Sequence, residues 1–592
     1  MRNFRSLQFV DVPINSASTV VVGENNTGKS NLIHALRLCL DVGLSSALRV
    51  LTKDDIHCEM DQSQPFQVFV GVEFTDFEGN ENEEALLHGT QIGVNRARIF
   101  YRFRPKRLVR EAFARGELEG QAIPLDDYQW ELFGGGNPAI DLTAINWDDE
   151  NADIGATSVQ LQYLQSYLVV FLPALRDVEA DLQQTRRSSL AKLIEACQLD
   201  KNERDALIDV VKAANAEIEG SPTIKAIATA IDSSLKSITG PAFSLDVDLG
   251  LSSPSFQSIV RNLIVLLSNG AVSQFEPRRN GLGLNNLLFI AILFEHFRKR
   301  AAQGNSAGEL ILIEEPEAHL HPQLQNTLFD ALRDLPFQSI VTTHSTQVTA
   351  KAPLSSYVML TNRPGAAPFV SVPTNSAALA SDDVQDLERY LDATKSNLLF
   401  ARRVMLVEGA AEMLLIPPLV KQVLGIDLER EGISVVGIHG VHFGPFARLF
   451  NADCLPKRCA IVADADIAPE ELPDDDDLDE PMKPQLGALE GEFVKVFLGA
   501  TTFEREITEV GNLGMLAGAT HALGAPKIHA ALLAHAQVHS AVPVPPALKD
   551  KVLNTAKRFG KARFAQVAAR NVGGATYLPP YIVQAIEWLR AK

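Results

Sequence analysis

The segment from Gly23 to Ser30 reads GENNTGKS and has the residue types that bind a nucleoside triphosphate. It follows a run of β-branched residues and precedes an amphipathic helical pattern, which is the context that a phosphate-binding loop requires. Backbone N–H groups of the loop can hold phosphates, the ammonium of Lys29 can reach the β- and γ-phosphates, and the hydroxyl of Ser30 can bind Mg²⁺. The predicted nucleotide contacts are Gly23, Asn25, Asn26, Thr27, Gly28, Lys29, Ser30 and Asn31.

Two carboxylates end a continuous apolar run in ELILIEEPEAHLHP, at Glu314 and Glu315. A strand that is buried on both faces belongs to a parallel α/β sheet, and its carboxyl end is where such a sheet presents ligands. We expect Glu314 to hold Mg²⁺ and Glu315 to polarise the attacking water. The next strand pattern, SIVTTHSTQV, ends in a polar turn with His344. A lone histidine is usually structural, but this position one strand after the glutamate pair favours a role at the nucleotide.

Carboxylates also follow strand patterns in the second half of the chain. RRVMLVEGAAE places Glu408 at a strand end and Glu412 one helical turn later, a further strand ends at Gly440, and RCAIVADADI places Asp464 and Asp466 on the same side of an extended strand end. Like charges that meet without a counter-ion repel, and a divalent cation resolves that conflict. Oxygen-rich sites suit Mg²⁺ or Mn²⁺. The alternative is that these are separate, exposed loop acids.

In this order, GENNTGKS, LIEEPEAHLHP and TTHS resemble the ABC ATPase heads of the RecF, Rad50 and SMC type. The resemblance implies that His344 senses the γ-phosphate and that two heads enclose ATP between them. It assigns NGLGLNN, with Gly281 and Gly283, to the signature loop that caps ATP bound on a partner subunit, although this segment departs from the LSGGQ consensus. The strand that begins such heads is abbreviated here, so either it is a short edge strand or translation starts earlier.

The order LVEGAAE, a glycine-ended strand and DAD resembles the Toprim domain of topoisomerases, primases and certain nucleases. With the ATPase motifs in front, the whole chain resembles the OLD (overcoming lysogenization defect) endonucleases, which include the nuclease subunit of Gabija-type phage defence. This resemblance implies a divalent-metal-dependent DNA endonuclease that uses ATP and hydrolyses phosphodiesters with two metal ions. It adds Glu504 as a metal ligand and Lys561 as a lysine that faces the scissile phosphate. The implied metal ligands of the nuclease are Glu408, Glu412, Asp464, Asp466 and Glu504, with catalytic roles for Glu408 and Lys561.

The expected fold class is α/β, an ABC-type head with a helical insert followed by a Toprim domain, because 592 residues are too many for one core. We expect the first part of the ATPase over residues 1–175 and its second part over 246–375, then a linker over 376–400 and the Toprim nuclease domain over 401–592. Residues 176–245 show apolar repeats at three- and four-residue spacing without sustained heptads, which indicates a compact helical insert. In the resembling family such inserts make dimer contacts.

The net charge of −19 argues against a broadly nucleic-acid-binding surface, because phosphate binding needs local positive charge. Two basic runs can supply it, although either can be a solvated helix face, which we favour for the first. The runs are Arg102, Arg104, Lys106, Arg107 and Arg110, and Lys557, Arg558, Lys561, Arg563 and Arg570. The acidic run 474–477 indicates a solvated loop.

Five scattered cysteines without CxxC spacing argue against disulfides or a zinc site. No apolar run approaches the roughly 20 residues of a membrane span, and the first residues lack the apolar segment of a secretory signal, so we expect a cytoplasmic protein.

Two other functions remain open. One is an ATP-switched DNA-binding repair scaffold that retains the acids without cleaving DNA. The other is a topoisomerase-like enzyme, which needs a nucleophilic tyrosine in a separate DNA-cleavage domain, and the chain has eight tyrosines but no segment typical of such a domain. The sequence also leaves open the DNA preference, whether ATP promotes or restrains cleavage, the oligomer beyond an expected homodimer, a helicase partner, and a role in phage defence or in DNA repair.

Overall fold

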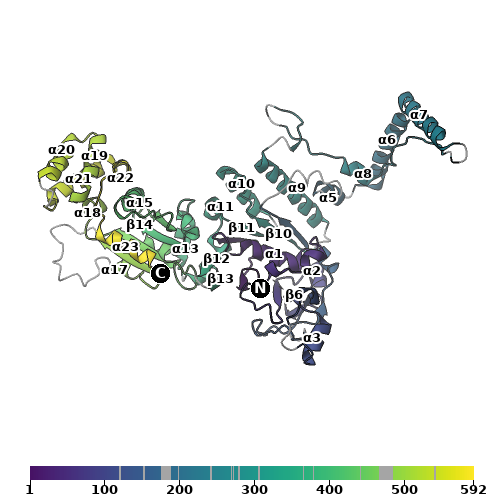
Figure 1. Ribbon diagram of the computed structural model, residues 1–592, viewed down its shortest axis with the longest axis horizontal. Helices are drawn as coiled ribbons and strands as arrows, with labels where there is room; N and C mark the ends of the chain where they lie inside the picture. The colour runs from purple at the N-terminus through teal and green to yellow at the C-terminus, as the bar shows by residue number, and fades with distance from the viewer. Residues whose placement is uncertain are drawn as a thin grey trace.

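The computed structural model describes residues 1–591 apart from short gaps at 119–121, 151–153, 175–188, 198, 241–242, 244, 269, 271, 278–280, 304–306, 336, 364–365, 378, 441, 466–483 and 539–541. Figure 1 shows an elongated molecule, with the N-terminal α/β domain in the middle and the C-terminal domain at one end. Four predictions fall partly or wholly in the gaps. They are the ligand Asp466, the acidic run 474–477, residues 176–188 of the helical insert and Asn280, the first residue of the segment NGLGLNN.

The core of the N-terminal domain is a six-stranded sheet in the order β13-β12-β3-β11-β10-β9. All pairings are parallel except that of β12 with β13. The strands are β3 (Ser18–Gly23), β9 (Leu168–Leu172), β10 (Glu309–Glu314), β11 (Gln338–Thr343), β12 (Tyr357–Arg363) and β13 (Ala366–Ser371). Because β3, β10 and β11 are neighbours, the segments that follow them emerge at the same edge of the sheet.

A second, antiparallel sheet covers this core and has the path β2-β1-β4-β6-β7-β8, with β5 paired to β6. Its strands are β1 (Arg2–Phe4), β2 (Leu7–Phe9), β4 (Val68–Thr75), β5 (Gln91–Gly93), β6 (Arg96–Pro105), β7 (Tyr128–Gly134) and β8 (Thr157–Ser158). Helix α1 (Lys29–Leu40) lies between the two sheets, where Leu32, Leu36 and Leu40 join a core with residues of both. Helices α2 (Glu81–Leu86) and α3 (Arg107–Ala114) follow strands of the second sheet.

The first basic run is only partly the solvated face that we expected, because Lys106 and Arg107 are exposed but Arg102, Arg104 and Arg110 are buried. Arg102 and Arg104 lie on β6 and are fully buried, because their guanidinium groups bind the backbone of the loop after β7. Arg102 donates to the carbonyl oxygens of Asn146 and Asp149 at 2.6 and 2.9 Å, and Arg104 pairs with Glu131 at 3.0 Å. These arginines therefore fix a loop, and neither is available to DNA.

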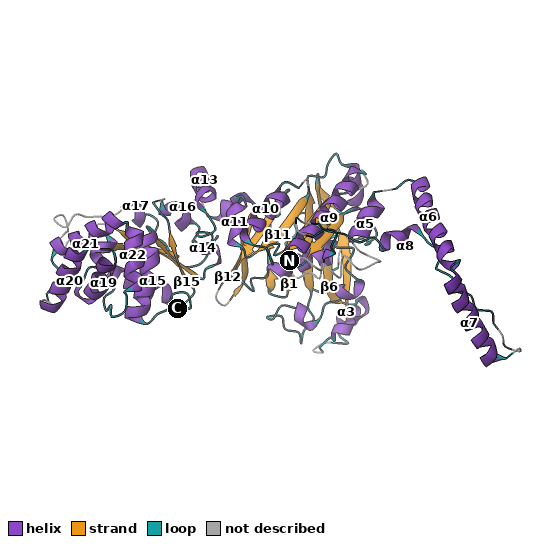
Figure 2. Ribbon diagram, turned by 90° about the horizontal axis from the view of Figure 1, so that it is seen from above, coloured by secondary structure: helices purple, strands orange, loops and turns teal. Residues whose placement is uncertain are grey.

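Helices α9 (Leu282–Ala302) and α10 (Pro322–Arg333) cover the other face of the core sheet through a cluster that includes Phe297, Leu328 and Ile311. Helix α11 (Thr346–Lys351) follows β11. The predicted insert, residues 176–245, contains α5 (Ser189–Ala196), α6 (Lys201–Glu219) and α7 (Pro222–Thr239), and α8 (Phe256–Arg261) follows it. Helices α6 and α7 project away from the domain, as Figures 1 and 2 both show.

The segment that we expected to be a linker is largely helical. It contains the end of α12 (Pro373–Ser376), with α13 (Ser381–Tyr390) and α14 (Asn397–Phe400). Leu387, Leu398 and Leu399 are buried in an apolar cluster that also holds residues of β3 and of the C-terminal sheet. Residues 376–400 therefore pack against both domains.

The C-terminal domain is built on a four-stranded parallel sheet in the order β15-β14-β16-β17. The strands are β14 (Arg403–Val407), β15 (Ile433–Gly437), β16 (Cys459–Asp464) and β17 (Val494–Gly499). The helices are α15 (Ala410–Leu424), α16 (Phe443–Arg448), α17 (Pro484–Gly487), α18 (Phe503–Glu506), α19 (Leu513–Ala522), α20 (Pro526–Val538), α21 (Pro546–Phe559), α22 (Lys561–Arg570) and α23 (Pro580–Arg590). The α/β fold class is confirmed in both domains.

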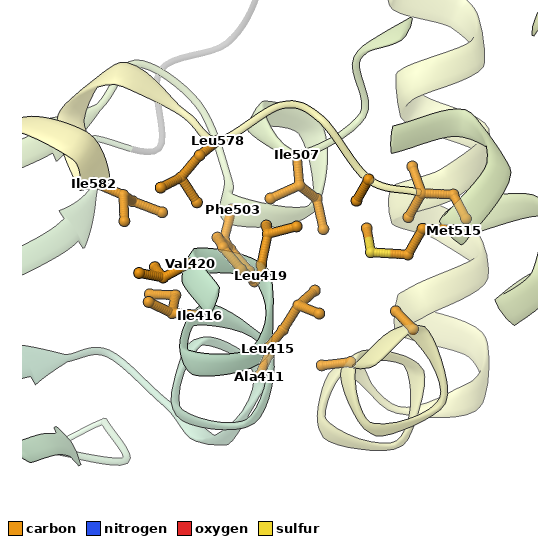
Figure 3. Close-up of a cluster of buried hydrophobic side chains, with 14 of the residues drawn as sticks. Ala411, Leu415, Ile416, Leu419, Val420, Phe503, Ile507, Met515, Leu578 and Ile582 are labelled. Carbon is orange, nitrogen blue, oxygen red and sulfur yellow. The ribbon is translucent and has the colours of Figure 1, made fainter. Parts of the chain in front are cut away.

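A large apolar core lies under the carboxyl edge of this sheet. Figure 3 shows Leu415 and Leu419 of α15 packed beside Phe503 of α18, Ile507 and Met515. This packing fixes the helices that carry acidic residues above the sheet. Within the described part of the chain, no helix is both long and apolar enough to cross a membrane.

Candidate functional site

The loop after β3 has the backbone of a phosphate-binding loop. Gly28 has a φ of 94°, and a Cβ added there would lie 2.7 Å from the side chains of Leu7 and Ser6. A Cβ on Gly23 would lie 2.2 Å from the carbonyl oxygen of Leu360 on β12. Only glycine fits at both positions, so the loop can bend tightly enough to direct its N–H groups at one point.

The side chain of Lys29 is buried and contacts the backbone of this loop. Its Nζ donates to the carbonyl oxygens of Gly23 and Glu24 at 2.8 and 2.7 Å. Burial lowers the pKa of Lys29 to about 8, opposed by the charges of Glu315, Glu317 and Glu24. The ammonium therefore remains mostly protonated at neutral pH and can turn from the carbonyls to a bound phosphate.

The glutamate pair lies beside this lysine. Glu314 accepts a hydrogen bond from Ser30, and burial raises the pKa of Glu314. Glu315 has a φ of 44°, and its N–H donates to the carbonyl oxygen of Thr342 at 2.9 Å. The left-handed backbone turns the Glu315 side chain out of the strand direction, which costs free energy and is common at functional sites.

His344 lies next to Glu315, with 3.5 Å between Nε2 and Oε1. Burial lowers the pKa of His344, and the charge of Lys29 lowers it further against the opposing effect of Glu315. The imidazole is therefore neutral at pH 7 and can either donate or accept one hydrogen bond at Nε2. The structure brings Lys29, Ser30, Glu314, Glu315 and His344 together as the sequence predicted.

Glu317 was not singled out from the sequence, but it organises the turn that carries His344. Its Oε1 accepts hydrogen bonds from the Thr343 hydroxyl at 2.8 Å and from the N–H groups of His344 and Ser345 at 2.8 and 3.1 Å. The sequence contains one indication that Glu317 belongs to the site, because it lies two residues after Glu315. Only the fold shows that it binds the neighbouring turn.

The other predicted nucleotide contacts divide into two groups. Asn25 and Asn26 are at or near the exposed tip of the loop, and Asn26 has a φ of 63°. Thr27 is buried and donates to the carbonyl oxygen of Glu24 at 3.0 Å. Asn31 donates to the Ser6 hydroxyl at 2.8 Å, so in this state it supports the loop from the side.

Gly281 and Gly283 lie at the start of α9. A Cβ on Gly283 would be 2.5 Å from the carbonyl oxygen of His319, whereas Gly281 is exposed with nothing within 4 Å of such a Cβ. Gly283 therefore permits α9 to approach the loop after β10. The assignment of both glycines to a loop that caps a partner's nucleotide stays a prediction.

The predicted nuclease acids converge at the carboxyl edge of the C-terminal sheet. The Glu408 carboxylate follows β14 and accepts the Asp464 N–H at 2.9 Å, and Asp464 ends the adjacent β16. The Asp464 carboxylate accepts the N–H of Phe503 at 3.0 Å, which places Glu504 beside it. Glu412, one turn into α15, accepts the Gly409 N–H at 3.1 Å.

These acids repel one another. Burial raises the pKa of Asp464 to about 8, and the charges of Glu408, Glu412 and Glu504 add to that rise. Burial also raises the pKa of Glu412, with further contributions from Glu504 and Glu408. Burial causes part of each shift, and the rest comes from mutual repulsion, because four carboxylates from separate segments lie near one another.

Glu504 and Lys561 form an ion pair at one side of this cluster. The Glu504 side chain is almost fully buried, its Oε1 has no hydrogen-bond partner among the described atoms, and its Oε2 lies 3.0 Å from Lys561 Nζ. Burial lowers the pKa of Lys561, but the hydrogen bond to and charge of Glu504 outweigh that effect and raise it. Lys561 is half-exposed at the start of α22, so it faces both the acids and solvent.

The donor set fits a divalent cation. Buried carboxylates with an oxygen that lacks a donor are costly unless a cation is bound. No three acidic, histidine or cysteine side chains in the described ranges already lie close enough together to enclose an ion. Of the predicted ligands, Asp466 alone lies outside the described residues.

Tyr581 is a further residue that sequence reasoning missed. Its ring packs on Gly499 at the end of β17, where an added Cβ would lie 3.0 Å from the ring. Burial raises the pKa of Tyr581 well above its ordinary value, and the charges of Asp464 and other nearby acids raise it further. Tyr581 therefore closes the side of the cluster as a neutral phenol.

Comparisons with known proteins agree with this division of the chain. A family model described as AAA ATPase domain matches residues 1–349, and one described as overcoming lysogenization defect protein-like, TOPRIM domain matches residues 399–466. Endonuclease GajA of Bacillus cereus (strain VD045) is 22% identical over 468 residues, which cover 76% of this chain and 72% of the relative. The OLD nuclease of Thermus scotoductus is 24% identical over 457 residues, covering 74% of this chain and 76% of the relative.

A solved structure, the C-terminal region of the Burkholderia pseudomallei OLD protein, is 27% identical and covers 32% of this chain and 98% of that chain, with a TM-score of 0.24. The predicted combination of an ATPase with an OLD-type Toprim domain is confirmed by the two family matches. The chain belongs to the AAA ATPase domain family, and behind its ATPase domain it carries an OLD-like Toprim domain.

Proposed function

We propose that this protein is an ATP-dependent or ATP-regulated endonuclease that hydrolyses DNA at the Toprim acids with divalent metal ions. The observation that carries the proposal is the convergence of four carboxylates and one lysine at one edge of the Toprim sheet. They are Glu408, Glu412, Asp464, Glu504 and Lys561. The names of two relatives, an endonuclease and a nuclease, support the same activity.

The acids of this cluster, with Asp466, would hold Mg²⁺ or Mn²⁺. When bound, such ions lower the pKa of water and stabilise the charge that develops on phosphate oxygens. Asp464 and Glu408 are positioned by backbone N–H groups and by the neighbouring strands, so they hold fixed places in the site. Lys561, exposed on its outer side, would bind the scissile phosphate and offset its charge.

ATP would bind at the loop after β3. Ser30 and Glu314 would hold its Mg²⁺, Lys29 would bind the β- and γ-phosphates, and Glu315 would polarise the attacking water. The neutral imidazole of His344, 3.5 Å from Glu315, would hydrogen-bond the γ-phosphate or the water. Gly281 and Gly283 would act on the nucleotide of a second copy of the chain.

A homodimer would bring those glycines to the partner's nucleotide. The projecting α6 and α7 carry exposed apolar side chains that favour burial against another surface. These residues are Leu207, Val210, Ile218, Ile227, Ile231 and Ile238. The insert is therefore the proposed dimer contact.

DNA would approach along α21 and α22. Lys557, Arg558, Arg563 and Arg570 are exposed on these helices, which also present Lys561 to the acids. Arg102, Arg104 and Arg110 of the first basic run do not compete for this role, because they are buried. A role in phage defence or DNA repair, with a helicase as partner, belongs to the same proposal and rests on the family resemblance.

The primary experiment is cleavage of supercoiled plasmid by the purified chain with Mg²⁺, with Mn²⁺ and with EDTA. Nicked or linear product that needs a divalent cation supports the proposal. Intact plasmid under all conditions favours the DNA-binding scaffold, and relaxed, religated topoisomers favour the topoisomerase.

A further inference from the structure

The phosphate-binding loop and the Toprim domain share a buried ion pair. Glu24, the second residue of the loop, places Oε1 at 2.7 Å from the Nζ of Lys457. The side chain of Lys457 is only 6% exposed, and its ammonium also donates to the carbonyl oxygens of Ala401 and Leu399 at 2.8 and 3.3 Å. A lysine buried to this degree is costly without a charged partner, so the position of Lys457 depends on Glu24.

A second cation lies close to the same carboxylate. Arg402 places Nε at 3.9 Å from Glu24 Oε2, and its side chain is 80% exposed. A cavity of about 850 Å³ opens beside these groups, and Asn25, Asn26 and His344 of the ATPase domain share its lining with Phe400 and Arg402. The ring of Phe400 lies 6.5 Å from that of His344.

Arg402 and Lys457 lie just before two strands that lead to the nuclease acids. Arg402 directly precedes β14, which leads to Glu408, and Lys457 lies two residues before β16, which ends at Asp464. At roughly 3.3 Å per residue, each strand separates the two ends by about 15 to 20 Å. The two strands are paired and buried, so they transmit a displacement as a unit.

The apolar core is continuous across this contact. Val20 and Val22 of β3, which leads into the phosphate-binding loop, belong to one cluster with Leu406 of β14 and Ile461 of β16. A close-packed core has little free volume in which a shift can be absorbed. Movement of the loop is therefore expected to reach the Toprim strands.

We propose that Lys457, through its ion pair with Glu24, is a positioning residue that couples the nucleotide state of the ATPase domain to cleavage at the Toprim acids. This inference rests on the proposed nuclease function. It assigns the link between the two sites to one contact at the amino ends of β14 and β16.

A bound nucleotide would compete for the groups that hold this loop. Lys29 binds the carbonyl oxygen of Glu24, and the Thr27 hydroxyl donates to the same oxygen. A bound triphosphate would attract Lys29 and add negative charge near this loop. The exposed Arg402 could then turn from Glu24 toward the phosphates, and the balance of charge around Lys457 would change with it.

The experiment compares plasmid cleavage rates with and without a non-hydrolysable ATP analogue at saturating concentration. We expect the wild-type rate to change by about five-fold or more between the two conditions, the range of typical site-to-site coupling. Lys457→Met should bring the ratio of the rates close to one, while cleavage without nucleotide and affinity for the analogue stay near wild type. Lys457→Arg keeps the charge and should restore the response.

Lys395 offers a matched control. It is as buried as Lys457 and lies in the segment 376–400, but it pairs with Asp392 at 2.8 Å and not with a residue of the phosphate-binding loop. Lys395→Met should therefore keep the wild-type response. Glu24→Gln, which preserves shape and removes charge, tests the same contact from the ATPase side if Lys457→Met does not fold.

The outcomes separate the two proposals. If the wild-type cleavage rate responds to the analogue and Lys457→Met or Glu24→Gln keeps that response, the proposed coupling contact is wrong. The proposed nuclease function is not affected by that result. A wild-type enzyme that cleaves equally with and without the analogue also overturns it. A chain that cleaves DNA with no divalent cation overturns the proposed function itself.

Discussion

The two candidate sites are built alike but differ in how fully their charged groups are paired within the protein. Each lies at the carboxyl ends of parallel strands. In the ATPase domain, Lys29 donates to two carbonyl oxygens and one oxygen of Glu317 accepts three hydrogen bonds, although the other oxygen of Glu317 has no partner among the described residues. In the Toprim domain, Glu504 is buried with an oxygen that has no donor among the described residues, and burial and three neighbouring carboxylates raise the pKa of Asp464 to about 8.

This difference indicates how each site responds to its ligand. In the nucleotide site, binding should replace the internal hydrogen bonds of Lys29 with contacts to phosphate. The metal site stores repulsion that a cation relieves, so metal binding should stabilise the folded protein as well as enable chemistry. The following changes test whether the two sites differ in this way.

The largest expected effect comes from Asp464→Ala. Removal of a central metal ligand should reduce plasmid cleavage by about 1,000-fold, comparable to the loss of a main charge-stabilising group in other enzymes. ATP hydrolysis should persist, because Asp464 lies in the other domain. Nicking assays and phosphate release on the same preparation measure both. Loss of both activities, or of neither, would contradict the separation of the two sites.

Glu315→Gln should act in the opposite sense. The amide cannot polarise water as the carboxylate does, so ATP turnover should fall by about 100-fold or more. Nucleotide binding should remain, since Lys29 and the loop N–H groups are unchanged. Metal-dependent cleavage measured without nucleotide should also remain. Retained hydrolysis would remove Glu315 from its proposed role.

A smaller effect is expected for Glu317→Gln. The amide oxygen can still accept hydrogen bonds, but it binds the Thr343, His344 and Ser345 donors less strongly than a carboxylate does. The turn that carries His344 should loosen, and kcat for ATP should fall by about ten-fold with little change in KM. Asp330→Asn, on the exposed face of α10, is a suitable control. A change confined to KM would show that Glu317 supports binding only.

The smallest effect is on stability, and it depends on pH. The pKa of Asp464 is about 8 in the fold against 3.8 in an unfolded chain, so the metal-free fold binds this proton more tightly. Stability of the metal-free protein should therefore fall as pH rises from about 4 to about 8. Melting temperatures in EDTA should be lower at pH 8 than at pH 6, and Mg²⁺ or Mn²⁺ should raise them more at pH 8.

Asp464→Asn isolates this contribution from other titrating groups. The variant should lose part of the difference in melting temperature between pH 6 and pH 8. Equal stabilisation by metal at both pH values in the wild type would contradict the stored repulsion.

Most of the site residues that the sequence predicted lie at the ends of strands. Apolar runs followed by glycine or acidic residues located the phosphate-binding loop, the Glu314–Glu315 pair and the acids at 408 and 464, because parallel strands of a buried sheet have that pattern. In the structure, the Glu314–Glu315 pair lies beside the phosphate-binding loop, and Glu408 lies beside Asp464. Glu504 and Lys561 came from the family resemblance alone, since no periodicity distinguishes them from other helical acids and bases.

Other features could not be read from the sequence. The role of Glu317 depends on the turn of a neighbouring strand, and the pair Glu24–Lys457 joins residues more than four hundred positions apart. The run at Arg102 and Arg104 was misread because an alternating strand pattern does not show which loop covers its polar side. Such contacts are tertiary, and local pattern carries no information about them.

The buried arginines also affect how the protein meets DNA in solution. The net charge is already −19, and Arg49, Arg102 and Arg104 are enclosed in the interior, so the outer surface has fewer positive groups than the total suggests. At low ionic strength the acidic surface repels a polyanion over roughly a Debye length, about 10 Å at 0.1 M. Moderate salt should therefore speed the encounter before higher salt weakens the contact with the helices around Lys561.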